Sequence, residues 1–134
     1  MEQNKPIVLP NFELEIMHVI WDKGEATVQE VKDALSEAHP GAYSTFMTVM
    51  RRMEKKGLLK HEMHEDGRTF VYKSLVSREE VSSSMFQDIY QRLFRGSSRR
   101  LADAINALFR EEEITPEEIQ RLKKLIAEKG EQDE

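Results

Sequence analysis

The sequence predicts a mainly α-helical fold with a small β-hairpin, namely a winged helix-turn-helix followed by a three-helix region. Three observations lead to this prediction. Apolar residues recur at helical spacing in three short N-terminal segments, two alternating segments flank an Asp-Gly pair, and three more helical segments follow. Because 134 residues suffice for a small domain with an appendage, we predict a domain at 1–76, a helical region at 77–130 and a flexible tail at 131–134.

The first three helices are predicted from their start and stop signals. After a short disordered lead, Asn11 is expected to cap the first helix and Gly24 to end it. Thr27 and Glu30 have the spacing of a capping box at the start of the second helix. The third helix is expected at about residues 44–56. A helix-turn-helix needs these three elements in this order.

Two strands are expected after the third helix, at 58–63 and 69–74. The loop between them contains Asp66 and Gly67, and an Asp-Gly pair between alternating segments is a strong hairpin signal. This hairpin is the predicted wing.

The rest of the chain is predicted to form three helices. Ser77 and Glu80 make a second capping box, and the helix that they open is expected to end by Gly96. A fifth helix follows, and a sixth begins at Thr115. From Gly130 onward the sequence is polar, and we expect a loose tail.

These last three helices carry more apolar surface than they can hide among themselves in so small a unit. A second copy of the chain is the simplest cover for that surface, so we predict a homodimer. The predicted dimerisation residues are Val81, Met85, Ile89, Leu93, Leu101, Ile105, Leu108, Leu122 and Leu125.

Positive charge is confined to the middle of the chain. The formal net charge is -5 overall, but residues 43–78 contain eight basic and four acidic side chains, for a local net charge of +4. Local charge matters most for binding a polyanion, because fields are screened within about 8 Å at physiological salt. We therefore expect double-stranded DNA to bind to the helix and hairpin of this segment.

The predicted third helix has an apolar face and a polar, basic face. Phe46, Val49, Met50 and Met53 share the apolar side, whereas hydroxyl and basic residues share the other. Hydroxyl groups can contact bases or phosphates, and Arg and Lys neutralise the nucleic-acid backbone. The predicted DNA-contacting residues are Ser44, Thr45, Thr48, Arg51, Arg52 and Lys55, with Arg68 in the wing and Thr27 through its backbone N–H.

Several function classes are not expected. The chain has no cysteine, which excludes disulfides, thiolate metal clusters and a catalytic cysteine. No apolar run approaches the roughly 20 residues of a membrane span, and we expect a cytoplasmic protein. No catalytic triad spacing or phosphate-binding loop occurs, so we expect neither an enzyme nor a cofactor. His61 and His64 should point to opposite faces of a strand, which disfavours a metal site.

A set of short segments, taken in order, resembles the penicillinase-repressor family of BlaI/MecI-type transcriptional repressors. The segments are FELEIM (12–17), Ile20-Trp21, TVQEV (27–31), AYST (42–45), RMEKKGL (52–58), Gly67-Arg68, Tyr72 and LVSREE (75–80). The resemblance covers about residues 9–129. It implies a homodimer that represses transcription by occupying a palindromic operator, for example of a resistance or stress operon.

The resemblance also bears on regulation, because an inactivating protease or sensor is an implied partner. Penicillin-responsive members are cleaved at an Asn-Phe bond, and Ala107-Leu108 stands at that place in this chain. Copper-responsive members use a Cys-x-Cys pair, which a chain without cysteine excludes. Two alternatives stay open: a metal- or ligand-responsive regulator, and a winged-helix protein-interaction module that does not bind DNA.

Overall fold

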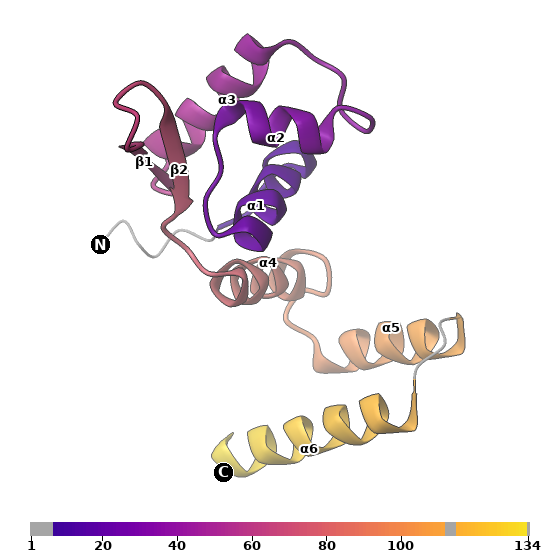
Figure 1. The fold of residues 1–134 in the computed structure, drawn as a ribbon. Helices are drawn as coiled ribbons and strands as arrows, with labels where there is room; N and C mark the ends of the chain where they lie inside the picture. Colours follow the sequence, from indigo (N-terminus) through magenta and orange to yellow (C-terminus); the bar gives the residue numbers. More distant parts are fainter. Residues whose placement is uncertain (1–6, 112–114, 134) are drawn as a thin grey trace. The chain divides into compact units, whose positions relative to one another are not determined.

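A computed structural model describes residues 7–111 and 115–133 of the chain. The described residues form helices and one two-stranded antiparallel sheet, in agreement with the predicted fold class (Figure 1). The elements are α1 (Asn11–Lys23), α2 (Val28–Leu35), α3 (Tyr43–Lys55), β1 (Leu59–Met63), β2 (Phe70–Ser74), α4 (Arg78–Arg92), α5 (Ser98–Glu111) and α6 (Pro116–Asp133).

The chain divides into two compact units, Met1–Ile89 and Tyr90–Glu134. The first unit contains α1, α2, α3, the hairpin and most of α4, and the second contains α5 and α6. No helix in the described residues is long and apolar enough to cross a membrane.

The signals at the ends of the first helices mostly act as predicted. Gly24 ends α1 with a φ of +88°, a left-handed conformation that glycine adopts without steric cost. The capping box of α2 is complete, because Glu30 N donates to Thr27 Oγ1 at 3.0 Å and Thr27 N donates to Glu30 Oε1 at 2.8 Å. The prediction for Asn11 is wrong, because Pro10 occupies the N-cap position and Asn11 is already helical.

The described part of the N-terminal lead is packed rather than disordered. Leu9 is 6% exposed and belongs to the hydrophobic core, and Ile7 N donates a hydrogen bond to Ser84 Oγ in α4. The predicted disordered lead is therefore wrong for residues 7–10, while residues 1–6 lie outside the described chain. Three apolar residues before a proline are too few to show any periodicity.

One hydrophobic core holds α1, α2, α3 and the hairpin together. The predicted inward residues of α3, Phe46, Val49, Met50 and Met53, are all buried in it. This burial fixes the rotation of α3 about its axis, because a helix with its apolar side in the core must turn the opposite side outward. The outward side is the polar and basic one.

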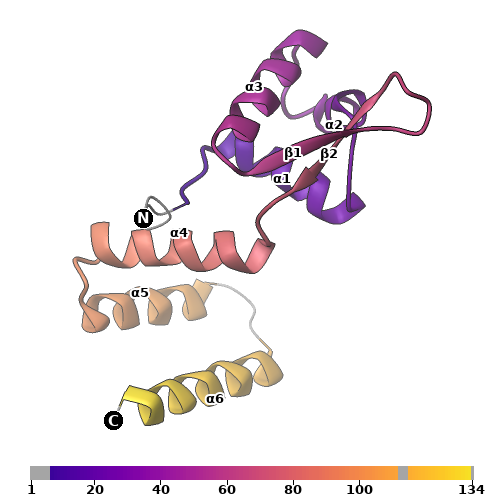
Figure 2. The same ribbon diagram turned by 90° about the vertical axis from the view of Figure 1, so that its left-hand side faces the viewer.

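The hairpin is tied to the helices by its second strand. β1 and β2 pair in antiparallel register from Leu59 with Ser74 to Met63 with Phe70. Ala26, between α1 and α2, also exchanges two backbone hydrogen bonds with Tyr72, at 3.0 and 2.8 Å. Figure 2 shows the two strands as a narrow ribbon that ends in a projecting loop. The sequence did not predict this bridge between Ala26 and Tyr72, because a single residue between two helices shows no strand pattern.

The later helices also begin as predicted. Ser77 and Glu80 form the capping box before α4, with hydrogen bonds of 2.9 Å in both directions. Thr115 is hydrogen-bonded in the same way to Glu118 at the start of α6. At its other end α6 passes through Gly130 and continues to Asp133, so the loose tail predicted from Gly130 is wrong as far as residue 133. Residue 134 lies outside the described chain.

Candidate nucleic-acid interface

The outward face of α3 presents the side chains that the sequence assigned to DNA. The residues Ser44, Thr45, Thr48, Arg51, Arg52 and Lys55 are all exposed. The first turn of α3 contains no acidic residue, and its N-cap residue Ala42 makes no side-chain capping bond. The start of the helix therefore presents N–H groups and a positive dipole end without a local negative charge to neutralise them.

One flank of this face is anchored to α1 by a buried carboxylate. Glu13 is 3% exposed, and both of its carboxylate oxygens accept hydrogen bonds from Lys56 Nζ, at 3.0 and 3.2 Å. Arg52 Nε lies 3.8 Å from Glu13 Oε2. A buried carboxylate needs such partners because its desolvation is costly. Arg52 is thus shared between an internal ion pair and the exposed face.

Sequence reasoning missed this role of Glu13, although a signal was available. Glu13 precedes Ile16 by three residues and Met17 by four, which places it on the core side of α1. An acid on the apolar side of a helix needs a basic partner from another element. The pair at the end of α3, Arg52 and Lys56, supplies it.

The other flank of α3 borders a pocket of about 340 Å³ between α3, the start of α2 and the wing. Three predicted DNA-contacting residues line this pocket: Thr27 at the N-cap of α2, Arg51 of α3 and Arg68 of the wing loop. The backbone N–H of Thr27, through which that contact was predicted, already donates to Glu30 Oε1 in the capping box. The complete lining consists of Thr27, Val28, Gln29, Tyr43, Met47, Arg51, Arg68, Thr69, Phe70 and Tyr72. The structure therefore brings together Thr27 and Arg68, which are 41 positions apart in the sequence.

The phenol of Tyr72 lies within the electrostatic influence of α3. Burial is the largest cause that raises the pKa of Tyr72, and the nearby Glu54 carboxylate raises this pKa further. Arg51 acts in the opposite sense, because its positive charge and a hydrogen bond favour the phenolate. Arg51 therefore turns towards the wing.

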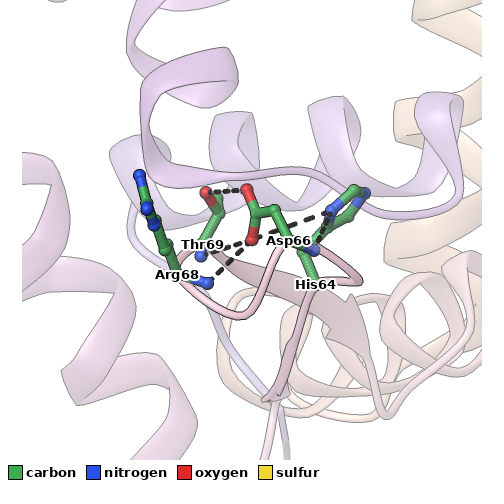
Figure 3. Close-up of polar contacts among 4 residues, drawn as sticks. All are labelled: His64, Asp66, Arg68 and Thr69. Carbon is green, nitrogen blue, oxygen red and sulfur yellow. Dashed lines mark hydrogen bonds and ion pairs between the residues drawn. The ribbon is translucent and has the colours of Figure 1, made fainter.

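Asp66 shapes the tip of the wing. Its carboxylate accepts hydrogen bonds from Arg68 N at 2.8 Å, Thr69 N at 3.0 Å and Thr69 Oγ1 at 2.8 Å (Figure 3). These bonds lower the pKa of Asp66 below its ordinary value, the Arg68 amide being the largest cause. Asp66 binds Arg68 only through the backbone N–H of Arg68, and in Figure 3 the guanidinium of Arg68 points away from Asp66. The guanidinium of Arg68 is therefore available to an external anion.

The strands of the wing carry cations that are already paired. Glu62 lies 2.9 Å from Lys73 Nζ and 3.3 Å from Lys60 Nζ, and Lys73 is also 3.6 Å from Glu25. The hydrogen bond from Lys73 is the main cause that lowers the pKa of Glu62, and the same bond raises the pKa of Lys73. These lysines offer less net charge to a polyanion than Arg51 and Arg68 do.

The two histidines of the hairpin, His61 and His64, contact different acidic residues. His61 Nδ1 is 2.8 Å from Glu54 Oε2, and its ring packs edge-on against Phe70. His64 lies in the loop after Met63, as the predicted strand bounds of 58–63 place it, and its Nδ1 is 4.0 Å from Asp66 Oδ1. The argument that His61 and His64 point to opposite faces of one strand therefore does not apply. Within residues 7–111 and 115–133, no group of His, Asp and Glu has a geometry that could hold a metal ion.

The predicted dimerisation residues fall into two groups. Val81 is 2% exposed and Met85 is half-buried, and both pack on the core of their own chain. Leu101 and Ile105 of α5 are also half-buried. The other residues keep large exposed fractions: Ile89 43%, Leu93 69%, Leu108 51%, Leu122 38% and Leu125 54%.

Comparison with known proteins assigns the chain to a family. Residues 9–128 match the family described as penicillinase repressor. The chain belongs to that family. A Bacillus licheniformis protein named penicillinase repressor is 28% identical over 116 residues, which are 87% of each chain. The family consists of transcriptional repressors and not of enzymes, as the sequence predicted.

One further relative agrees with this assignment, and one solved structure shares the fold. A Mycobacterium tuberculosis protein named transcriptional regulator BlaI is 32% identical over 95 residues, which cover 70% of this chain and 67% of that protein. A crystal structure of an Escherichia coli MarR mutant complexed with operator DNA has a TM-score of 0.50 and 16% identity. The aligned region covers 78% of this chain and 76% of the MarR chain, and the likeness concerns the fold alone.

Proposed function

We propose that this chain is a homodimeric repressor that binds a palindromic operator and blocks a promoter. Residues 1–76 contact DNA, with α3 in the major groove and the wing on the sugar-phosphate backbone, and residues 77–130 form the dimer. The relatives named penicillinase repressor and transcriptional regulator BlaI support repression as the activity. We further propose that the repressed genes form a resistance or stress operon.

The observation that carries the proposal is the convergence of Arg51 and Arg68, from two different parts of the fold, on one pocket beside the exposed face of α3. Two guanidinium groups from different elements can neutralise phosphates on both sides of a groove. Ser44 and Thr48 are exposed in the N-terminal half of α3 and offer short hydroxyl groups to base edges. A winged helix with charges in these places has the chemistry of a DNA reader.

Selection of bound fragments from random-sequence DNA, followed by salt titration of the best duplex, tests this proposal. We expect an enriched palindrome whose affinity falls steeply with salt, because each phosphate contact releases counterions. If no sequence is enriched at low salt, the protein-interaction module becomes the better explanation.

Two arginine variants test which surface binds. Arg51→Ala should lower affinity for the selected duplex and reduce the slope of log affinity against log salt by about one. Arg121→Ala removes an exposed charge of the same type from α6 and should change neither quantity. Equal losses in the two variants would mean that general positive charge, and not α3, attracts the DNA.

The exposed apolar residues support the dimer. Leu93 and Leu125 are more than half exposed in the single chain, and burial against a second copy would remove this surface from water. Two protomers would also present two α3 helices to the two halves of a palindrome.

Sedimentation across a range of protein concentrations tests the dimer. The wild-type chain should sediment as a dimer, and Leu93→Asp should weaken the dimer at least about tenfold, because it would bury a charge in an apolar contact. Ser83→Asp adds the same charge at an exposed polar position of α4 and serves as the control. A wild-type chain that stays monomeric at all concentrations would refute the dimer.

An inactivating protease or sensor is the remaining proposed partner. Ala107-Leu108 lies inside α5, where both residues are exposed. A protease that needs an extended substrate must first unwind this turn of α5. Mapping the cleavage products formed after induction would show whether the bond between these two residues is cut.

A further inference from the structure

One side of α3 carries an apolar strip next to its polar face. Tyr43, Met47 and Arg51 follow each other at intervals of four residues, so they lie in one row along the helix. All three line the pocket between α3 and the wing. We call Tyr43 and Met47 the apolar strip.

Core packing does not account for the whole strip. Met47 is half-buried and packs in part against the core, but the Tyr43 side chain remains 42% exposed. The residues of α3 that close the core are Phe46, Met50 and Met53, each at most 1% exposed. The strip therefore leaves an apolar and aromatic surface at the pocket between α3 and the wing, beside the polar outward side of α3.

The position of the strip matches the part of a recognition helix that meets base edges. Tyr43 and Met47 stand in the N-terminal half of α3, next to Ser44 and Thr48, and N-terminal residues of such a helix contact the bases. Arg51 follows in the same row and borders the pocket that it shares with Arg68 of the wing. With α3 docked as in the proposed function, the apolar strip would meet the bases and Arg51 the backbone.

The chemistry of the major groove favours one partner for an apolar surface at this place. Phosphates, carbonyl oxygens, ring nitrogens and amino groups require polar or charged partners, and among the base edges of the major groove the 5-methyl group of thymine is the largest apolar group. We propose that Tyr43 and Met47 bind a thymine 5-methyl group in each half-site and so set a requirement for an A·T pair beside the contacts of Ser44 and Thr48. This inference rests on the proposed function.

Replacement of single thymines by uracil in the selected duplex tests the inference. Uracil lacks only the methyl group and keeps every hydrogen-bonding group of thymine. At one or two positions in each half-site, we expect wild-type affinity to fall about fourfold for each methyl group lost from an apolar contact. At those positions Met47→Ala should bind the thymine and uracil duplexes equally.

The wing supplies a matched control. Arg68→Ala should weaken binding to both duplexes by the same factor and leave the difference in affinity between thymine and uracil unchanged. The reason is that a phosphate contact does not depend on the methyl group of the base. The fluorescence of Trp21, the single tryptophan, in urea shows whether each variant keeps the winged-helix unit folded.

The outcomes separate this inference from the proposed function. A sensitivity to uracil that Met47→Ala abolishes and Arg68→Ala preserves establishes the apolar strip as a thymine reader. If the selected operator binds tightly with every thymine replaceable, or if Met47→Ala loses the same factor on both duplexes, the inference is wrong while the repressor proposal stands. If no duplex is selected, both fail.

Discussion

The buried ion pair between α1 and α3 gives a stability prediction that can be worked through in detail. Lys56→Met keeps most of the aliphatic stem of Lys56 but removes two hydrogen bonds to Glu13, at 3.0 and 3.2 Å. The side chain of Glu13 is 4% exposed, so its carboxylate would stay desolvated with only Arg52, at 3.8 Å, as a charged partner. Breaking one side of a buried pair costs more than the pair itself contributes.

The magnitude follows from the exposure of the two partners. A hydrogen bond to a charged group contributes about 1.5–3 kcal/mol, but the Lys56 side chain is 45% exposed and water screens part of its interaction. We expect Lys56→Met to lower the free energy of unfolding by about 2 kcal/mol. In urea this corresponds to a loss of about 1 M in the midpoint.

Trp21 fluorescence during urea unfolding at neutral pH measures this loss, at one protein concentration for all variants. Lys55→Met is the matched control, because Lys55 is the preceding residue, is exposed and forms no ion pair within the described residues. Its change should stay within about 0.5 kcal/mol.

A double variant separates the ion pair from other effects of the substitution. Glu13→Leu combined with Lys56→Met should recover most of the lost stability, because an apolar pair carries no desolvation penalty. Equal midpoints for Lys56→Met and Lys55→Met, or a double variant that is less stable than Lys56→Met, would refute the assigned role of Glu13.

Three further predictions follow from local contacts. Thr27→Ala removes the capping box of α2 and should cost about 1 kcal/mol of unfolding free energy in the same urea assay; an unchanged midpoint would contradict it. Because the folded-state pKa of Asp66 is lowered, its stabilisation of the wing holds above the ordinary pKa of about 3.9 and is lost as pH falls through the lower folded value. An NMR titration of the Thr69 amide should therefore have its midpoint below about 3.9, and a midpoint above that value would be inconsistent with the turn. Gly57→Ala should destabilise by about 1 kcal/mol because Gly57 has a φ of +85°. Gly41→Ala should not, because Gly41 has no positive φ and a Cβ added there would lie 3.7 Å from Phe46 Cε2, an ordinary contact distance.

The parts of the fold that local sequence controls could be predicted. The spacing of Phe46, Val49, Met50 and Met53 determined which side of α3 is buried, and with it the exposed face. The capping boxes at Thr27 and Ser77 marked the starts of α2 and α4 because both partners lie within one turn. In each case the interacting residues are three or four positions apart.

The features that the sequence did not reveal depend on contacts between distant residues. Glu13 meets Lys56 across 43 positions; its place on the core side of α1 signals that it needs a basic partner, but nothing in the sequence says which element supplies that partner. Ala26 pairs with Tyr72 through backbone atoms, which leave no trace in residue type. Of the candidate site, residue types identified the arginines, but only the folded chain groups Arg51, Arg68 and Thr27 at one pocket.

Site-directed DNA cleavage tests the central claim most directly, namely that α3 enters the major groove of a two-fold operator. Because the chain has no cysteine, Thr48→Cys creates a unique attachment point for an iron chelate that cuts nearby DNA. We predict two sets of cuts inside the selected operator, related by two-fold symmetry and about one helical turn, roughly 34–36 Å, apart. The same chelate on Ser36→Cys, exposed at the end of α2, is the control for attachment elsewhere on the unit. Absence of cuts from position 48, or cuts no more localised than those from position 36, would contradict the account.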